Sequence, residues 1–181
     1  SNALNRLSSG LRVNSAKDDA AGIAIATRLE AQSRGMSVAI RNANDALSFL
    51  QTAEGGISKM TESLNRMREL AVQAANGTYT NSDRENLNAE FAQLSSEIGR
   101  VVSQTEFNGI AMFTGTNGQQ TFQVGANVNQ VISVDIASMG DASVTLAGSN
   151  ICTANSATSV INAIDTALNT VNTERAEIGG A

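Results

Sequence analysis

The sequence contains no histidine and no proline among its 181 residues. Histidine is the side chain that most often serves as a general base and as a metal ligand, so its absence removes both roles. Histidine-based catalytic triads and zinc-protease motifs are therefore excluded. Without proline, nothing in the chain forbids very long helices. We accordingly expect no enzyme, no metal site and no cofactor, but long helices.

Aromatic residues and cysteine are also scarce. Aromatics make up 3% of the chain, with no Trp. Compact globular cores usually rely on more large rings than this, whereas small and aliphatic side chains fill a narrow seam between helices. The single Cys152 cannot form an internal disulfide, and without a basic neighbour in the sequence it is expected to be a spectator thiol.

Charge and hydropathy exclude two further kinds of partner. The net charge is −5 and the pI is about 4.7, so binding of nucleic acid by a broad basic face is not expected. No run of 18 apolar residues occurs, which predicts no membrane insertion.

One regular pattern dominates the first half of the chain. Ser15 is the predicted N-cap of a helix over 16–75, with Asp18 and Asp19 in its first turn. Apolar residues then recur every seven positions in two series offset by three, as at the a and d positions of a coiled coil. Such a helix is about 85 Å long. The a series is Met36, Ala43, Leu50, Ile57, Leu64 and Ala71, and the d series is Ala39, Ala46, Ala53, Met60, Met67 and Ala74.

Two more helices are predicted after the turn at Asn76-Gly77-Thr78. The first covers 82–104 and begins with a capping box at Ser82-Asp83-Arg84-Glu85, and it is expected to fold back on the long helix. The second covers 156–179 and is capped by Asn155 or Ser156.

The segment 105–153 loses the seven-residue period and is rich in Gly, Asn, Thr and Val. Strands are predicted at Thr121–Val124 and Val131–Ile136, joined as a hairpin, with a further short strand around Val144–Leu146. The predicted fold class is mainly α. It is an elongated antiparallel helical bundle of two N-terminal helices and one C-terminal helix, with a small β-hairpin region. It forms one domain over 4–179, and residues 1–3 resemble the remnant of a removed tag.

A cluster of polar residues lies off the apolar seam. In the heptad count Arg66 is at c, Arg68 at e and Glu69 at f, while Leu70 is at g. Leu70 is either a core residue flanking the seam or an exposed apolar anchor rimmed by charge, as in protein-binding patches. The pattern alone leaves both interpretations open.

Several segments, taken in order, resemble bacterial flagellins. The resemblance covers residues 4 to about 127 and again about 157 to 179. It is carried by Leu7–Gly22, Arg41–Ala46, Arg68–Asn76, Gln104–Gly109 and Phe122–Asn127.

The resemblance implies the rod-shaped inner-tube domain of flagellin and a role as the structural subunit of the flagellar filament. The implied partners are other flagellin subunits and the flagellar type III export apparatus, and the implied localisation is secreted and extracellular, in the filament. The terminal segments that form the inner core of flagellin filaments are expected to lie outside this chain. About 25 residues stand where many flagellins carry variable outer domains.

The flagellin family is also recognised by Toll-like receptor 5, which adds a second implied partner. The residues that match the family's receptor motif are Arg66, Arg68, Glu69, Leu70, Gln73 and Glu90. The resemblance thus favours the exposed interpretation of Leu70.

Three rival classes share part of the pattern. A hook–filament junction protein has related terminal helices but lacks the close match at 68–76. A coiled-coil effector or needle-tip protein of a type III system predicts the heptads but not the ordered flagellin segments. A flagellin with an inserted metalloprotease domain needs histidine and a longer central segment.

Overall fold

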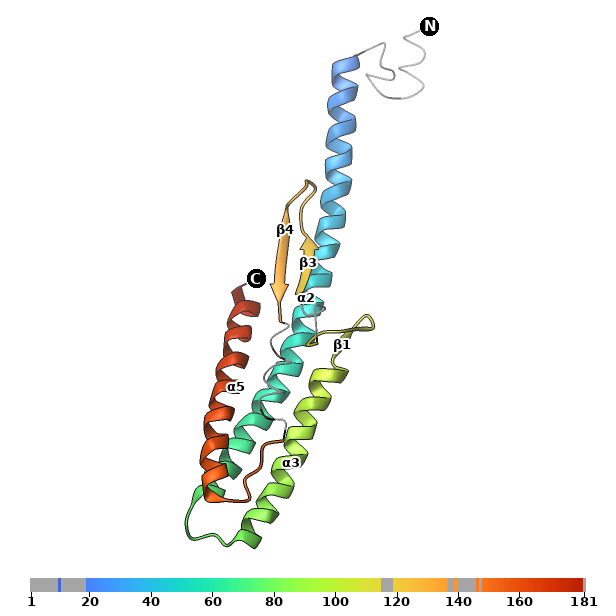
Figure 1. Ribbon diagram of the computed structural model, residues 1–181. Helices are drawn as coiled ribbons and strands as arrows, with labels where there is room; N and C mark the ends of the chain where they lie inside the picture. The colour runs from blue at the N-terminus through green and yellow to red at the C-terminus, as the bar shows by residue number, and fades with distance from the viewer. Residues whose placement is uncertain are drawn as a thin grey trace. The chain divides into compact units, whose positions relative to one another are not determined.

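The computed structural model describes residues 10, 19–114, 119–136, 139, 146 and 148–180. Three helices account for most of them (Figure 1): α2 over Ala20–Ala75, α3 over Asn81–Gln104 and α5 over Ala154–Gly180. The strands are short. They are β1 at Glu106–Phe107, β2 at Ile110–Ala111, β3 at Gln119–Gln123 and β4 at Val131–Asp135. The prediction of a mainly helical fold with a small β-hairpin region is confirmed.

The chain divides into two compact units. The smaller takes its described residues from 1–44 and 123–131, and the larger from 45–122 and 132–181. The single domain expected over 4–179 stays a prediction. No helix within the described part of the chain is long and apolar enough to cross a membrane.

The larger unit is a three-helix bundle. In Figure 1, α3 and α5 lie on either side of the second half of α2. The ion pairs Arg68–Asp165 and Arg175–Glu54 show that α5 runs antiparallel to α2, because the partner number falls on α5 as it rises on α2. Buried residues at steps of three and four on α5 complete the core, and they are Ala157, Val160, Ile164, Ala167 and Val171.

The apolar seam of α2 is wider than the sequence predicts. Most a and d residues from Ala46 onward are buried, but so are Phe49 and Leu70, which are 3% and 1% exposed and occupy g positions. A helix that contacts two neighbours needs a broader apolar stripe than the narrow a/d seam of a two-stranded coiled coil. At the other end of the seam, Met36 is 53% exposed, so the predicted burial is wrong there.

Helix capping differs from the prediction at the N-termini of α3 and α5, and Asp19 has another role than predicted at the start of α2. Asp19 precedes α2 and accepts a hydrogen bond from the Gly22 N–H at 2.8 Å, so it caps the helix instead of lying in its first turn. Thr80 and Asp83 form the capping box of α3, with the Asp83 N–H donating to Thr80 Oγ1 at 3.3 Å. The Ser156 N–H donates to Thr153 Oγ1 at 3.1 Å, so Thr153 caps α5. The predicted cap Ser15 lies outside the described residues.

Arg84, which the capping prediction treated as part of a box, has a different role. Its side chain is 6% exposed, and Nε donates to the carbonyl of Ala74 at 2.7 Å. Nη2 donates to the carbonyl of Asn76 at 3.0 Å. The last carbonyls of a helix have no partner within the helix. Arg84 on α3 therefore stabilises the C-terminus of α2 and the turn that follows.

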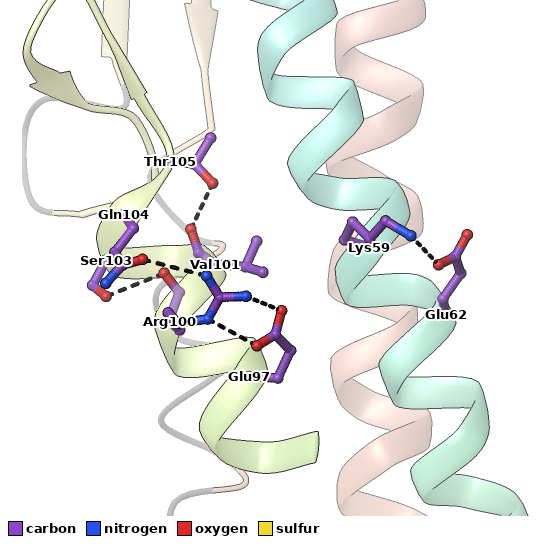
Figure 2. A network of polar contacts seen from close by, with 8 residues as sticks. All are labelled: Lys59, Glu62, Glu97, Arg100, Val101, Ser103, Gln104 and Thr105. Carbon is purple, nitrogen blue, oxygen red and sulfur yellow. Dashed lines mark hydrogen bonds and ion pairs between the residues drawn. The ribbon is translucent and has the colours of Figure 1, made fainter. Parts of the chain in front are cut away.

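The C-terminus of α3 carries its own polar contacts (Figure 2). The Thr105 N–H and Oγ1 both donate to the carbonyl of Val101, at 3.0 and 2.6 Å, and this closes the last turn. One turn earlier, Arg100 pairs with Glu97 on the same helix. Lys59 and Glu62 form a similar pair within α2, at 2.8 Å. Such exposed pairs within one helix add little stability.

Two hairpins follow α3. β1 pairs antiparallel with β2 through a turn at Asn108 and Gly109, whose φ angles of 52° and 74° suit a type I′ turn. The sequence prediction missed this hairpin. β3 pairs with β4, close to the predicted strands, and Thr121 and Ser133 face each other across it at 3.1 Å. Of the further strand predicted at Val144–Leu146, the structure describes Leu146 alone.

Two g positions of α2, Phe49 and Gly56, contact aromatic side chains from the segment that follows α3. At Gly56 a Cβ would come within 2.8 Å of the Phe113 ring, so only glycine permits this close approach. Phe49 packs edge-on against Phe107, with ring centroids 5.7 Å apart, and also contacts Phe122. In the smaller unit, Asn42 Nδ2 donates to the carbonyl of Gln123 at 2.9 Å.

Candidate functional site

The receptor-motif residues predicted from the sequence gather on one surface of the larger unit. Arg66, Arg68, Glu69 and Gln73 are exposed on α2, and Glu90 is exposed on α3. We call this surface the charged face. The bundle explains its position, since these α2 residues occupy heptad positions c, e and f, away from the apolar stripe.

Arg66 joins α2 to α3. Its Nε donates to Glu90 Oε1 at 2.7 Å, and its Nη1 donates to Glu69 Oε2 at 3.0 Å. These two hydrogen bonds raise the pKa of Arg66 above its ordinary value, and the bond to Glu90 has the larger effect. The guanidinium is held between two carboxylates, so its orientation is fixed although its side chain is 50% exposed. The structure thus brings together three of the predicted site residues.

Arg68 joins α2 to α5 on the opposite side of the charged face. Its Nε donates to Asp165 Oδ1 at 2.7 Å. This hydrogen bond raises the pKa of Arg68 and lowers the pKa of Asp165. Asp165 had no distinguishing signal in the sequence, because a single Asp on a helix is usually only solvated.

Leu70 is not part of the exposed surface. Its side chain is 1% exposed and belongs to the core cluster with Met67, Ala71, Ala74 and Phe91. The expectation that Leu70 is exposed is wrong, because the g positions of α2 face the rest of the bundle. Its interpretation as a core residue flanking the seam is confirmed.

Val72 is the apolar side chain that the charged face exposes instead. It is 49% exposed and lines a shallow depression with Asn65, Arg68, Glu69 and Gln73. The heptad pattern already held the signal, since Val72 is at position b, which points away from the seam. Beside it, Gln73 Nε2 donates to the Tyr79 hydroxyl at 2.8 Å and so connects the face to the α2–α3 turn.

The ion pair between Arg68 and Asp165 predicts a pH dependence of stability. The pKa of Asp165 is lowered in the folded chain from its ordinary 3.8. The stabilisation is therefore fully present well above pH 3.8 and is lost as the pH falls through the lower folded value. Asp165→Asn is expected to lower the urea midpoint of unfolding slightly at pH 7, and this difference should shrink as the pH falls below 3.8. A difference between variant and wild type that persists unchanged at pH 2 would contradict this role for the pair.

The charged face carries no arrangement typical of catalysis. The carboxylates of Glu69, Glu90 and Asp165 are each engaged by an arginine. Across the described ranges, no group of three or more His, Cys, Asp or Glu side chains lies close enough to hold a metal ion. The charged face thus consists of paired charges around a half-exposed valine.

Comparison with known proteins decides the family. Residues 1–118 match the family model described as the bacterial flagellin N-terminal helical region. The chain belongs to the bacterial flagellin family. It is 48% identical to flagellin A of Vibrio cholerae over 137 residues, which is 76% of this chain and 36% of the relative. This flagellin chain thus spans about a third of the length of that curated relative.

Solved structures agree with this assignment. Flagellin of Bacillus cereus matches with a TM-score of 0.69 at 31% identity, covering 77% of this chain and 81% of that one. A putative flagellar hook-associated protein from Vibrio parahaemolyticus matches with a TM-score of 0.72 over 92% of this chain and 88% of that one, but at 20% identity. The latter likeness concerns the fold alone. The distinction between flagellin and a hook-associated rival therefore rests on sequence.

Proposed function

We propose that this flagellin chain is part of the structural subunit that polymerises into the bacterial flagellar filament and is not an enzyme. The observation that carries the proposal is the match of residues 1–118 to the flagellin family together with the helical bundle. In this role the partners are other flagellin subunits. The subunit reaches the filament outside the cell through the flagellar type III export apparatus.

Electron microscopy of the protein as the cell produces it tests the proposal. Under polymerising conditions we expect long tubular filaments. Persistence of monomers across a full range of salt concentrations and temperatures would contradict a filament role.

We further propose that Toll-like receptor 5 recognises the charged face, through Arg66, Arg68, Glu69, Gln73 and Glu90. The support is their exposure on one surface and the two hydrogen bonds that hold the Arg66 guanidinium. An ordered arginine at the centre of a surface loses little conformational entropy on binding, which suits a binding hot spot. Leu70 is buried and does not contact the receptor in this proposal. It supports the charged face indirectly, because its packing in the core holds α2 in place.

Receptor activation in reporter cells tests this second proposal. Arg66→Ala combined with Glu90→Ala is expected to raise the concentration for half-maximal response about tenfold or more, as for the loss of a hot-spot residue. Arg100→Ala is the matched control, because it also removes an exposed, carboxylate-paired arginine but lies outside the charged face. An unchanged response of the double variant would contradict recognition at this surface. The filament proposal would be unaffected.

A further inference from the structure

The outer surface of α5 differs from the other helix surfaces of the larger unit. From 155 to 173, every exposed position of α5 holds an uncharged polar residue. We call this set the uncharged face. Asp165, the one charged residue of this stretch, has a side chain that is 42% exposed and is paired with Arg68 of α2. The uncharged face consists of Asn155, Thr158, Ser159, Asn162, Thr166, Asn169, Asn172 and Thr173.

The neighbouring helices show what an ordinary solvated surface of this chain looks like. On α2 the exposed positions between 58 and 73 include Lys59, Glu62, Arg66, Arg68 and Glu69. The exposed positions of α3 likewise carry charges of both signs, Asp83, Glu85, Glu90 and Arg100. Over five turns of α5 the only charged side chain is Asp165, which is paired with Arg68, so this surface stands apart within the same bundle.

Three hydroxyl groups of the uncharged face donate to backbone carbonyls one turn earlier on α5. Thr166 Oγ1 donates to the carbonyl of Asn162 at 2.9 Å, and Thr173 Oγ1 donates to the carbonyl of Asn169 at 3.0 Å. Ser159 repeats the pattern with Asn155 at 3.2 Å, so the motif recurs every seven residues. Because these hydroxyl hydrogens are used within the helix, the hydroxyl oxygens remain available as acceptors. The asparagine amides alongside supply both donors and acceptors.

This composition is unfavourable for an isolated exposed helix. Asn, Ser and Thr have lower helix propensity than Lys, Glu or Ala, which are the usual residues of solvated helix faces. Depletion of charge is instead a property of the central part of protein interfaces. A surface without ions also avoids the cost of desolvating them when a partner covers it.

The overall charge of the chain indicates the partner. At a net charge of −5, two copies repel each other, and contact is least opposed where neither copy presents a charge. We propose that the uncharged face of α5 packs against a second copy of this chain in the assembled polymer. The inference rests on the proposed filament function and assigns it a contact surface.

The size of the face sets what kind of contact it makes. Nineteen helical residues span about 28 Å, and a helix is about 10 Å wide, so the face offers roughly 300 Å². A stable two-protein interface buries about 800 Å² on each partner. The uncharged face is therefore too small to hold a pair of molecules together. It acts as one of several contacts that each subunit makes in a polymer, and a polar contact of this kind is insensitive to salt.

Charge insertion tests the inference in the protein as the cell produces it. Asn162→Glu with Asn169→Glu is expected to raise the critical concentration for polymerisation tenfold or more, measured by sedimentation and electron microscopy. Helix content and melting temperature should not fall, because Glu is the better helix former. Asn162→Gln with Asn169→Gln keeps the face uncharged and should polymerise within threefold of wild type. The matched control is Asn86→Asp with Gln93→Glu, which adds two carboxylates seven residues apart on the exposed surface of α3.

The possible results distinguish this contact from the filament function itself. Wild-type filaments, with polymerisation lost only in the α5 glutamate variant, would support the inference. Normal polymerisation of that variant, or an equal loss in the α3 control, would overturn it and leave the filament function standing. Failure of the wild type to polymerise would overturn the proposed function and this inference with it.

Discussion

Replacing Leu70 with alanine is expected to lower the free energy of unfolding by about 3 kcal/mol. Leu70 is 1% exposed and lies in the core cluster of the bundle, so the substitution removes three buried carbon atoms and leaves a cavity that the surrounding helices close only in part. For a chain of this size, such a loss lowers the melting temperature by roughly 6–12 °C.

Thermal unfolding followed by circular dichroism measures the effect of Leu70→Ala. The matched control is Val72→Ala, two residues further along the same helix, where the side chain is 49% exposed and the change should stay within about 0.5 kcal/mol. Equal melting temperatures for the two variants would show that Leu70 does not support the core. A weaker receptor response of Leu70→Ala would by itself reflect loss of folded protein, so Arg66 and Glu90 are the diagnostic positions for the charged face.

Replacing Arg84 with alanine is expected to cost about 3 kcal/mol. The substitution removes the two hydrogen bonds from the guanidinium to the carbonyls of Ala74 and Asn76, and it leaves a buried carbonyl at the end of α2 without this partner. Without Arg84, the turn between α2 and α3 loses its main polar connection to the helix before it. We therefore expect faster hydrogen exchange at residues 76–80 as well as a lower denaturant midpoint.

Arg84→Lys separates charge from geometry. Lysine keeps the positive charge but cannot place two donors on separate carbonyls in the fixed arrangement of a guanidinium, so its loss should be intermediate. Arg100→Ala, on the exposed surface of the same helix, should leave the denaturant midpoint nearly unchanged. Unchanged hydrogen exchange in Arg84→Ala would mean that the carbonyl contacts do not hold the turn.

The helices and the second hairpin were predictable because their patterns are long or chemically distinctive. The seven-residue series located α2 and ended it at Ala75, as observed. The first residue of each helix was less predictable. Thr80 and Thr153 cap α3 and α5, although Ser82 and Asn155 or Ser156 fit the same rules. Several adjacent residues of cap-forming type occur at each start, and only the geometry of the turn selects among them.

The β1–β2 hairpin was missed although its sequence carried a signal. Asn108-Gly109 is the dipeptide that type I′ turns favour, but two-residue strands are too short to show an alternating pattern. The close approach of Phe113 to Gly56 had no signal of its own. It depends on two segments nearly sixty residues apart meeting on one face of α2.

The sequence predicted which residues belong to the candidate site, but not the burial of Leu70 or the ion pairs between helices. The polar residues of the charged face were placed on the outside of α2 by the heptad count, and the structure agrees. The same count put Leu70 at g, which is exposed in a two-stranded coiled coil but buried when a helix has two neighbours. The ion pairs of Arg66 with Glu90 and of Arg68 with Asp165 join separate helices, so no local pattern could reveal them.

The proposal that this flagellin chain belongs to a subunit of the filament makes a direct prediction about where the protein lies on the cell. Immunoelectron microscopy with antibodies against the exposed surface of α3 tests this on intact bacteria and on sheared, partly dissociated filaments. We expect label along the whole length of the filament. Label confined to the junction between hook and filament, or confined to the cell body, would contradict it.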